Sequence, residues 1–260
     1  MRHVVNVAGR ELRGLFVSPV AYAVLSLFSV LAGLFFIVTL AAFNEWIFRL
    51  QQFQAFDQLA ELNLNEHLIG QFYHSMAVVL LFLVPGITMG LFASEKTNGT
   101  QELLLTSPLT GWDIVLGKFL AGAAFVLVLG AIVGAFPALL FVYGDPELLP
   151  TLSGLLGVVL VGLTYVAIGA FASSLTRSQT VAFLLTFVVL LVLLILPAIS
   201  DLGVTGSGGA GGALRWLSTE THLEELVKGL VDTQHLAYFA VVIAGFLVLT
   251  KASVESVRWR

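Results

Sequence analysis

Residues 93–122 read ASEKTNGTQELLLTSPLTGWDIVLGKFLAG, and this stretch decides the fold because it stands between two long apolar runs. Its first half carries charged and amide side chains, and its middle carries three consecutive leucines at 103–105 before Pro108. Leucine favours a helix, whereas a proline ends one. The stretch therefore predicts a short helix with one apolar side, lying at the membrane surface between two spans.

The same stretch has a helix start signal near each end. Asn98 and Gln101 have the spacing of a capping box, in which the third helical residue bonds back to the cap. Thr110 and Asp113 repeat this spacing directly before the next apolar run. We therefore expect Asn98 to cap the short helix and Thr110 to cap the following span.

The composition of the chain indicates an integral membrane protein. Of its 260 residues, 58% are hydrophobic and only 11% are charged, and the mean hydropathy is +0.98. A soluble domain usually carries about 25% charged residues. A net charge of −4 gives no sign of nucleic-acid binding, and the absence of cysteine excludes disulfides, thiolate catalysis and cysteine-ligated metals. Charged and apolar residues are mixed at the start, so we expect no cleaved signal peptide.

Six apolar runs approach or exceed the roughly 20 residues that a membrane-crossing helix needs. No Asp, Glu, Lys or Arg lies within any of them, which disfavours ion-coupled carriers, proton pumps and membrane-embedded enzymes. We therefore predict an all-α polytopic membrane protein with six transmembrane helices in a single domain, residues 1–260. The runs are Val20–Phe43, Met76–Ala93, Phe119–Gly144, Leu152–Ala172, Ser178–Ser200 and Leu236–Thr250.

The distribution of basic residues predicts the orientation of these spans. Nine of the twelve lysines and arginines fall on the side that holds both termini and the second and fourth loops. Because loops rich in Lys and Arg stay in the cytoplasm, both termini and the region 94–113 are expected there. The loop 201–235 is then external. The expected location is the cell (inner) membrane.

The N-terminal segment 1–17 is predicted to form a helix in the cytoplasmic interface. Its apolar residues at 5, 8, 12 and 15 have helical spacing, and Arg10, Glu11 and Arg13 lie among them. Ser18 and Pro19 follow, the residue types that cap a helix and occupy its first position. We expect them to end this helix and start the first span, and residues 46–53 to continue helical beyond it.

The external loop is predicted to hold a flexible linker and a short outer helix. Residues 203–212 are rich in glycine, and Thr221 with Glu224 fits a capping box. His222 and Glu225 have a spacing seen in metal pairs, but two such ligands are common by chance. The outer helix is expected to present one apolar face, formed by Leu223, Leu226, Val227 and Leu230.

Two further features concern motion and chemistry. Pro85 and Gly86 lie within the second apolar run, where they favour either a static kink or a hinge.

The chain has no GxxxxGK[ST], HExxH or GxSxG motif, so it is predicted to be non-catalytic and to bind no cofactor directly.

The stretch at 93–122 resembles the signature of type 2 ATP-binding-cassette (ABC) transporter permeases. Two other stretches, Arg10–Val24 and His222–Asp232, are similar to one branch of that family, which includes the permeases of gliding motility and of nitrous-oxide-reductase maturation. The glycine-rich residues 203–212 depart from the branch. The residues that carry the resemblance are Glu95, Lys96, Gly99, Thr100, Glu102, Leu103, Leu104, Pro108, Gly117 and Lys118, with His222, Gly229 and Asp232 in the outer helix.

The resemblance implies that the helix between spans two and three is a coupling helix, which docks on a separate cytoplasmic ATPase. It implies two ATPase subunits, which bind the ATP and magnesium, and a second permease subunit that is identical or related. It leaves room for membrane lipid and for an auxiliary protein outside the cell. The residues implied in coupling are Glu95, Gly99, Thr100, Glu102, Leu103, Leu104, Leu105 and Pro108.

Two functions fit this scaffold. In the first, the chain is the permease subunit of an exporter or extruder, and substrate moves between two six-span halves. In the alternative, the chain is a mechanical transmitter that acts on an outside partner, and nothing crosses the membrane. The sequence names neither the substrate nor the direction of transport.

Overall fold

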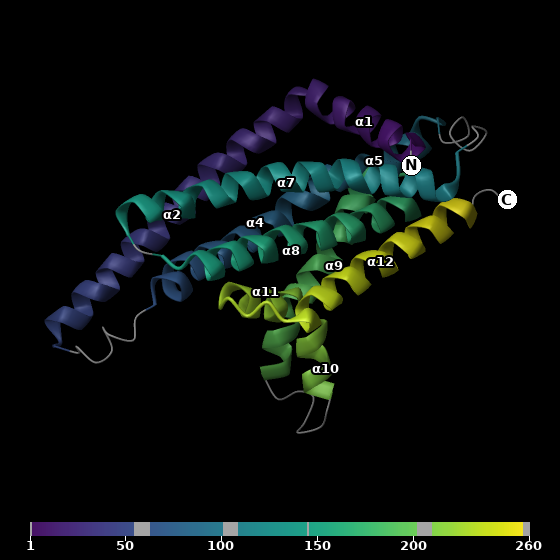
Figure 1. Ribbon diagram of the computed structural model, residues 1–260. Coiled ribbons are helices and arrows are strands. Elements are labelled where there is room, and N and C mark those ends of the chain that lie inside the picture. The colour runs from purple at the N-terminus through teal and green to yellow at the C-terminus, as the bar shows by residue number, and fades with distance from the viewer. Residues whose placement is uncertain (1, 55–62, 101–108, 145, 202–209, 257–260) are drawn as a thin grey trace.

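The computed structural model describes residues 2–54, 63–100, 109–144, 146–201 and 210–256. Within these ranges the regular elements are helices, and Figure 1 shows them as one elongated bundle. Six helical segments there are long and apolar enough to cross a membrane, which confirms the predicted fold class. The elements are α1 Arg2–Val17, α2 Pro19–Gln52, the π-helix η1 Asn65–Gly70, α4 Gln71–Thr88, α5 Gly90–Thr97, α7 Gly111–Tyr143, α8 Leu148–Leu175, α9 Gln179–Asp201, α10 Ala210–Leu217, α11 Thr219–Val227 and α12 Thr233–Ser256.

The helices extend well beyond the apolar runs from which they were predicted. The first span continues through residues 46–52, as predicted. The second span is built from η1, α4 and α5, so helix reaches Thr97 rather than Ala93. The third span begins at Gly111, eight residues before the apolar run, and therefore includes Asp113 and Lys118. The span helices thus include charged residues, which lie outside the six predicted apolar runs.

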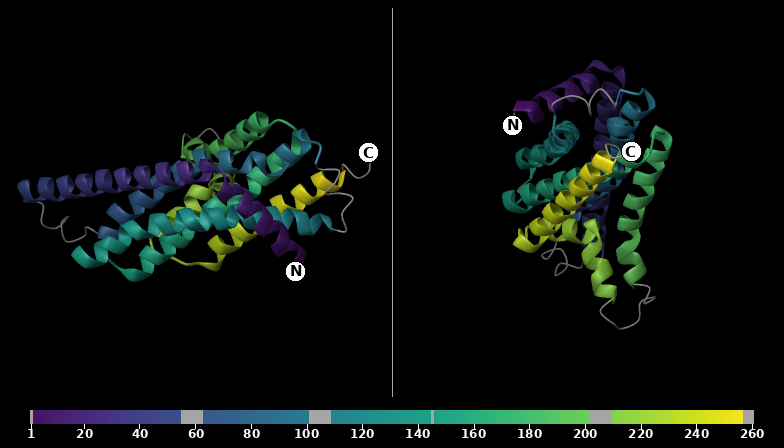
Figure 2. Two further views of the ribbon diagram at one scale, coloured as in Figure 1. Left: turned by 90° about the horizontal axis from the view of Figure 1, so that it is seen from above. Right: turned by 90° about the vertical axis from the view of Figure 1, so that its right-hand side faces the viewer.

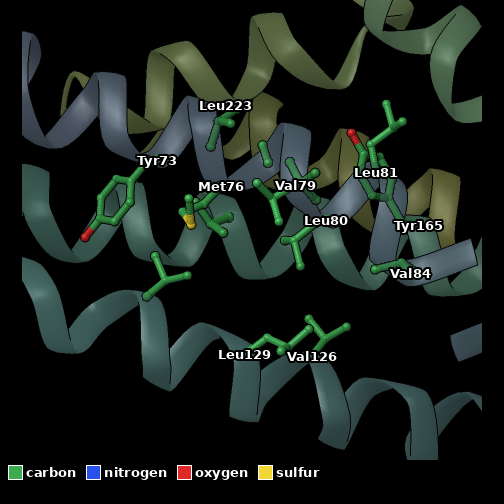
Figure 3. Packing of buried hydrophobic residues seen from close by; sticks show 14 of the residues in the cluster. Tyr73, Met76, Val79, Leu80, Leu81, Val84, Val126, Leu129, Tyr165 and Leu223 are labelled. Atoms are coloured by element: carbon green, nitrogen blue, oxygen red, sulfur yellow. The ribbon is translucent and has the colours of Figure 1, made fainter. Parts of the chain in front are cut away.

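The core of the bundle lies between α4 and α8. In the apolar window of α8, 67% of the residues are buried, against 22% in α2, so α8 is central and α2 peripheral. Figure 3 shows Tyr73, Met76 and Leu80 of α4 along the core, with Tyr165 of α8 beside Leu81 and with Val126 and Leu129 of α7 beneath them. These side chains are almost entirely removed from solvent. Their contacts tie α4 and α8 to α7.

Two helix starts follow the sequence signals. Ser18 has an extended backbone and its hydroxyl accepts a hydrogen bond from the backbone N–H of Val20 at 3.3 Å, with Pro19 as the first residue of α2. Thr110 and Asp113 form the full capping box at the start of α7. These two caps confirm the predicted corners at which α1 meets α2 and at which the third span begins.

The N-terminal helix does not rest only on the membrane surface. Val7 and Ala8 are buried against α7, whereas Val5, which the pattern placed on the apolar side, is 66% exposed. The buried face is therefore rotated from the predicted one, because α1 packs on a protein neighbour. Figure 2 shows α1 lying across the end of the bundle, on the same side as the end of α12.

The segment 201–235, which the sequence places outside the cell, differs from its prediction in three ways. Helix α10 already begins at Ala210, so the last residues of the glycine-rich stretch are helical, and 202–209 lie outside the described residues. Helix α11 is capped by Ser218, whose hydroxyl accepts from the N–H of Glu220, and not by Thr221. Leu223 and Leu226 are fully buried against Gly157 of α8, whereas Leu230 is 57% exposed. Helix α11 is thus part of the bundle rather than an outer surface helix.

Candidate functional site

A buried lysine holds three helices together at the end of the bundle where α1 lies. The side chain of Lys118, on α7, is 1% exposed. Its Nζ donates to Glu11 Oε1 of α1 at 3.1 Å and to Glu95 Oε1 of α5 at 2.9 Å. The ammonium also lies 5.3 Å from the centre of the Phe92 ring. Burial of an ammonium is costly unless it is paired, and here two carboxylates pair it.

Arg10 completes this ionic cluster, which we define as Arg10, Glu11, Glu95 and Lys118. Its guanidinium donates to Glu11 Oε1 at 2.9 Å and to Glu95 Oε1 at 3.5 Å. Arg10 is 57% exposed, so its pairs contribute less than those of Lys118. Arg13 is exposed and makes no ion pair among the described residues, and its role in an interfacial helix stays a prediction.

Close packing of α1 on α7 sets the geometry of the ionic cluster. A Cβ atom added at Gly117 would lie 2.6 Å from Val7 Cβ, and 3.1 Å from the carbonyl oxygen of Val4. Glycine is therefore the residue that lets α1 approach α7 closely enough for Glu11 to reach Lys118. The Gly-Lys pair of the sequence signature thus has a physical role. Gly117 leaves room for α1 to pack closely, and Lys118 binds α1 through Glu11.

We expect Gly117→Ala to push α1 away from α7 and to lengthen the Lys118–Glu11 contact. Overpacking of this kind costs about 1–3 kcal/mol of stability. The melting temperature of the purified protein should fall, and adding Val7→Gly should restore part of it, because that change removes both the Cβ and the Cγ1 that the new Cβ would meet. Gly14→Ala is the control, because a Cβ at Gly14 of α1 meets no atom within 4 Å. Equal effects of the two glycine changes would contradict this packing argument.

The end of α5 explains the next signature residues. Asn98 is the C-cap of α5, with helical φ and ψ, so the prediction that it caps a following helix is wrong. Gly99 has φ +69°, the left-handed conformation that glycine adopts without strain. The N–H of Thr100 then donates to the carbonyl of Glu95 at 3.0 Å. This is a Schellman-type ending, and it redirects the chain as it leaves the second span.

The same end of α5 is tied to the turn between α8 and α9. The ammonium of Lys96 donates to the carbonyl oxygen of Ser174, and the hydroxyl of Thr97 to that of Arg177. Ser253 of α12 also donates to the Ser174 carbonyl, at 3.1 Å. The second, fourth and sixth spans therefore meet where the segment 101–108 leaves and returns. Gln101, Glu102, Leu103, Leu104, Leu105 and Pro108 lie outside the described residues.

The second span is interrupted at Met89, one turn after the predicted hinge at Pro85 and Gly86. Helix α4 continues through Pro85 to Thr88, and α5 starts at Gly90. The hydroxyl of Ser173, on α8, fills the interruption. It donates to the carbonyl of Met89 at 2.9 Å and accepts from the N–H groups of Phe92 and Ala93 at 3.0 and 3.1 Å. A side chain of a neighbouring span thus replaces helical hydrogen bonds at this point.

A cavity lies beside the ionic cluster. Its volume is about 790 Å³, and its wall includes Arg10, Glu11 and Glu95 together with Leu15, Leu91 and Leu109. The charged groups of the cluster therefore line one side of an otherwise largely apolar space.

The three predicted site residues of α11 and the turn after it have structural roles. His222 is buried; its Nε2 donates to the carbonyl of Trp216 at 2.8 Å, and its Nδ1 lies 2.7 Å from Nδ1 of His235. Burial, with a smaller contribution from His235, lowers the pKa of His222, so the neutral ring is favoured. Gly229 has φ +86° and ends α11 in a Schellman motif, and Asp232 accepts from the N–H of Gln234 at the start of α12.

No group of three metal-ligating side chains exists within the described ranges. Both ring nitrogens of His222 already have partners, so it is unsuited to form the metal pair with Glu225 that its spacing suggested.

Sequence reasoning missed two elements of the site. Lys118 was part of the signature, but nothing local showed that it is buried or that Glu11 is its partner, 107 residues away. Ser173 was not singled out, because a serine directly after an apolar run carries no sign of the helix interruption that it fills. A signal for Lys118 was its position two turns inside a helix with a cap at Thr110, which places it on the side of Gly111 and Ile114.

The comparisons with known proteins agree with this arrangement. The family model for ABC-2 family transporter proteins matches residues 5–253, which is nearly the whole chain and includes every residue of the ionic cluster. No curated protein matches the chain. With six spans and this match, the chain belongs to the ABC-2 transporter family, as a transmembrane permease of the type 2 ABC class.

Proposed function

We propose that this chain is the permease subunit that couples ATP hydrolysis, carried out by a separate cytoplasmic ATPase, to export or extrusion of a substrate. The observation that supports this most is the convergence at one end of the bundle. The ionic cluster joins α1, α5 and α7, and the last turn of α5 is bonded to the α8–α9 turn. A force applied to the segment 101–108 would therefore reach four helices through short polar contacts.

The interruption at Met89 supplies the other half of the mechanism. On the C-terminal side of the interruption, α5 moves with the ionic cluster, whereas on its N-terminal side α4 is packed in the core against α8. Because Ser173 bonds both sides of the interruption, α5 has an anchor about which to tilt without unpairing backbone groups in the membrane. We infer that the interruption at Met89, with Pro85 one turn away, is the hinge.

The assembly that we propose contains two permease subunits and two ATPase subunits, since six spans form half of a transport pathway in this family. Both termini, the ionic cluster and the segment 101–108 are placed on the cytoplasmic side of the inner membrane, in accord with the excess of basic residues. The ATP and magnesium are bound by the ATPase, and this chain supplies no phosphate loop.

The test is recovery of an ATPase. A P-loop ATPase should co-purify with the wild-type chain in mild detergent, and the double variant Leu104→Asp with Glu102→Lys should lose it while still inserting in the membrane. Loss of an apolar contact in an interface costs about 1–3 kcal/mol, and a reversed charge adds to it. The matched control is Leu230→Asp with Glu224→Lys, the same changes at exposed positions near α11. Full recovery of ATPase and function in the double variant would refute the coupling role.

A further inference from the structure

The last turns of α12 contact both helices that flank the segment 101–108. Helix α5 ends at Thr97, shortly before this segment, and α7 begins at Gly111, shortly after it. Figure 1 shows the yellow end of α12 lying beside this region, close to the teal start of α7. Four residues of α12 make the contacts, and we call them the α12 brace: Lys251, Ser253, Val254 and Glu255.

On the α5 side, the α12 brace shares one carbonyl oxygen with the second span. The hydroxyl of Ser253 donates to the carbonyl oxygen of Ser174, near the end of α8, at 3.1 Å. The ammonium of Lys96, near the end of α5, donates to the same oxygen. A carbonyl oxygen has two lone pairs, so it can accept both bonds at once. Helices α12 and α5 are thus joined through a single backbone atom.

On the α7 side, two charged side chains of the α12 brace lie against the first turn of the helix. The ammonium of Lys251 is 5.2 Å from the centre of the Trp112 ring, which is a cation–π distance. A Cβ added at Gly111 would lie 2.7 Å from Oε1 of Glu255, so this carboxylate lies directly against the backbone at which α7 begins. Lys251 and Glu255 also pair with each other, at 3.4 Å. One turn of α12 therefore holds the start of α7 in two places.

A small apolar cluster, separate from the main core, accompanies these polar contacts. It combines buried residues of α5, α7, α8 and α12, and Leu109 packs against it from just after the segment 101–108. Helix α5 and the first turns of α7 thus pack around α12 as a unit, on the C-terminal side of the interruption at Met89. The buried members of the cluster are Leu91, Phe92, Ile114, Val115, Ala170, Leu247 and Val254.

The polar contacts of the α12 brace are aimed at backbone positions rather than at other side chains of the core. Ser253 bonds a carbonyl oxygen, and Glu255 lies on a glycine. The Lys251–Glu255 pair keeps 29% and 37% of its side-chain surface exposed, and an exposed ion pair contributes little to stability. Such contacts act on where the helices lie more than on whether the protein folds.

The separation of α5 and α7 sets the distance between the two ends of the segment 101–108. A segment whose ends are already held at the distance of its docked form loses less conformational entropy when it binds. We propose that the α12 brace is a positioning element, which holds α5 and α7 at the separation that docking of this segment on the ATPase requires. This role rests on the proposed function, in which the ATPase is the partner of the segment. The brace residues act through α5 and α7 and need not touch the ATPase.

The first test measures docking. The brace variant, Ser253→Ala with Glu255→Ala, removes the bond to the Ser174 carbonyl and the contact with Gly111. The P-loop ATPase that co-purifies with the wild-type chain is separated, and its binding to each detergent-purified permease is followed by surface plasmon resonance. We expect the dissociation constant of the brace variant to be about tenfold higher, because the segment must then be ordered on binding. Ser253→Thr with Glu255→Gln keeps a hydroxyl and an acceptor oxygen, so it should retain the wild-type affinity.

The matched control is Tyr238→Phe with Glu224→Ala, far from the segment 101–108. It also removes one hydroxyl bond to a carbonyl, that of Tyr238 to Leu217 at 2.7 Å, and one glutamate that pairs with a lysine four residues away. Its melting temperature should fall at least as far as that of the brace variant, whereas its dissociation constant should stay at the wild-type value. If affinity follows melting temperature in both variants, the α12 brace has a structural role only. If the brace variant binds like the wild type, it has no role in docking, and either result overturns the proposal.

A second measurement needs no ATPase. Because the chain has no cysteine, Asn98→Cys and Leu120→Cys place one spin label at the C-cap of α5 and one on an exposed residue of α7. Electron paramagnetic resonance then gives the distribution of distances between the labels. The brace variant should broaden this distribution and the control variant should not; an unchanged width in the brace variant would overturn the positioning role. If the wild-type chain recovers no ATPase, the proposed function fails, and the width alone decides whether the α12 brace fixes α5 relative to α7.

Discussion

Lys118→Met is expected to lower the stability of the protein by about 3 kcal/mol and to weaken its coupling to the ATPase. Removal of one partner of a buried ion pair typically costs about 3–5 kcal/mol, because the other charge stays buried without compensation. The lower end applies here, since Glu11 and Glu95 keep about a fifth of their side-chain surface exposed and retain Arg10. Thermal unfolding of the detergent-solubilised protein, followed by circular dichroism, measures the loss.

The control for Lys118 is Lys251→Met, which removes a half-exposed lysine paired with Glu255 on α12. Its effect should stay below about 1 kcal/mol. In the Lys118→Met background, Glu11→Gln with Glu95→Gln removes the stranded charges, and stability should partly return. If Lys118→Met unfolds at the wild-type temperature, the ionic cluster does not hold α1 to α5 and α7.

Gly169→Ala is expected to separate α8 from α4 at the interruption of the second span. A Cβ at Gly169 would lie 2.1 Å from Oγ1 and 2.6 Å from Cβ of Thr88, distances that no relaxation of one side chain can relieve. Thr88 itself is buried and donates to the carbonyl of Val84 at 2.9 Å. We expect a loss of about 3 kcal/mol, at the upper end for an overpacked core, and weaker contact of Ser173 with Met89.

Gly86→Ala is the matched change on α4, because a Cβ there meets nothing within 4 Å. It should be neutral or stabilising, since alanine favours a helix over glycine by about 1 kcal/mol. Adding Thr88→Gly should recover part of the stability of Gly169→Ala, because it removes the Oγ1, Cβ and Cγ2 atoms that the new Cβ would meet. Comparable melting temperatures for the Gly169 and Gly86 variants would show that the two spans are free to move apart at this point.

Local signals were sufficient for the spans and for two of their caps. The number of spans follows from run length and hydropathy, and Ser18 and Thr110 follow from capping chemistry, which acts over three residues. Asn98 misled because a residue that favours the start of a helix is also common at its end, and Gly99 directly after it was the better indicator. The predicted spans were shorter than the observed helices, because hydropathy marks the part of a helix that lies in the bilayer and not the helix as a whole.

Contacts between distant residues could not be predicted from the sequence. The rotation of α1 depends on the meeting of Val7 with Gly117, and the burial of α11 depends on Gly157. Amphipathic spacing tells only that a helix has an apolar side, and that side fits a membrane surface as well as a protein neighbour. The roles of Lys118 and Ser173 belong to the same class, because their partners come from other helices.

The ionic cluster contains two acidic and two basic residues, and this balance has an electrical consequence. Moving one elementary charge through a membrane potential of 100 mV changes the energy by about 2.3 kcal/mol. A cluster in which Arg10 and Lys118 offset Glu11 and Glu95 carries no net charge, so its displacement as a unit does almost no electrical work. Displacement of the cluster itself would then proceed alike in an energised and a de-energised cell.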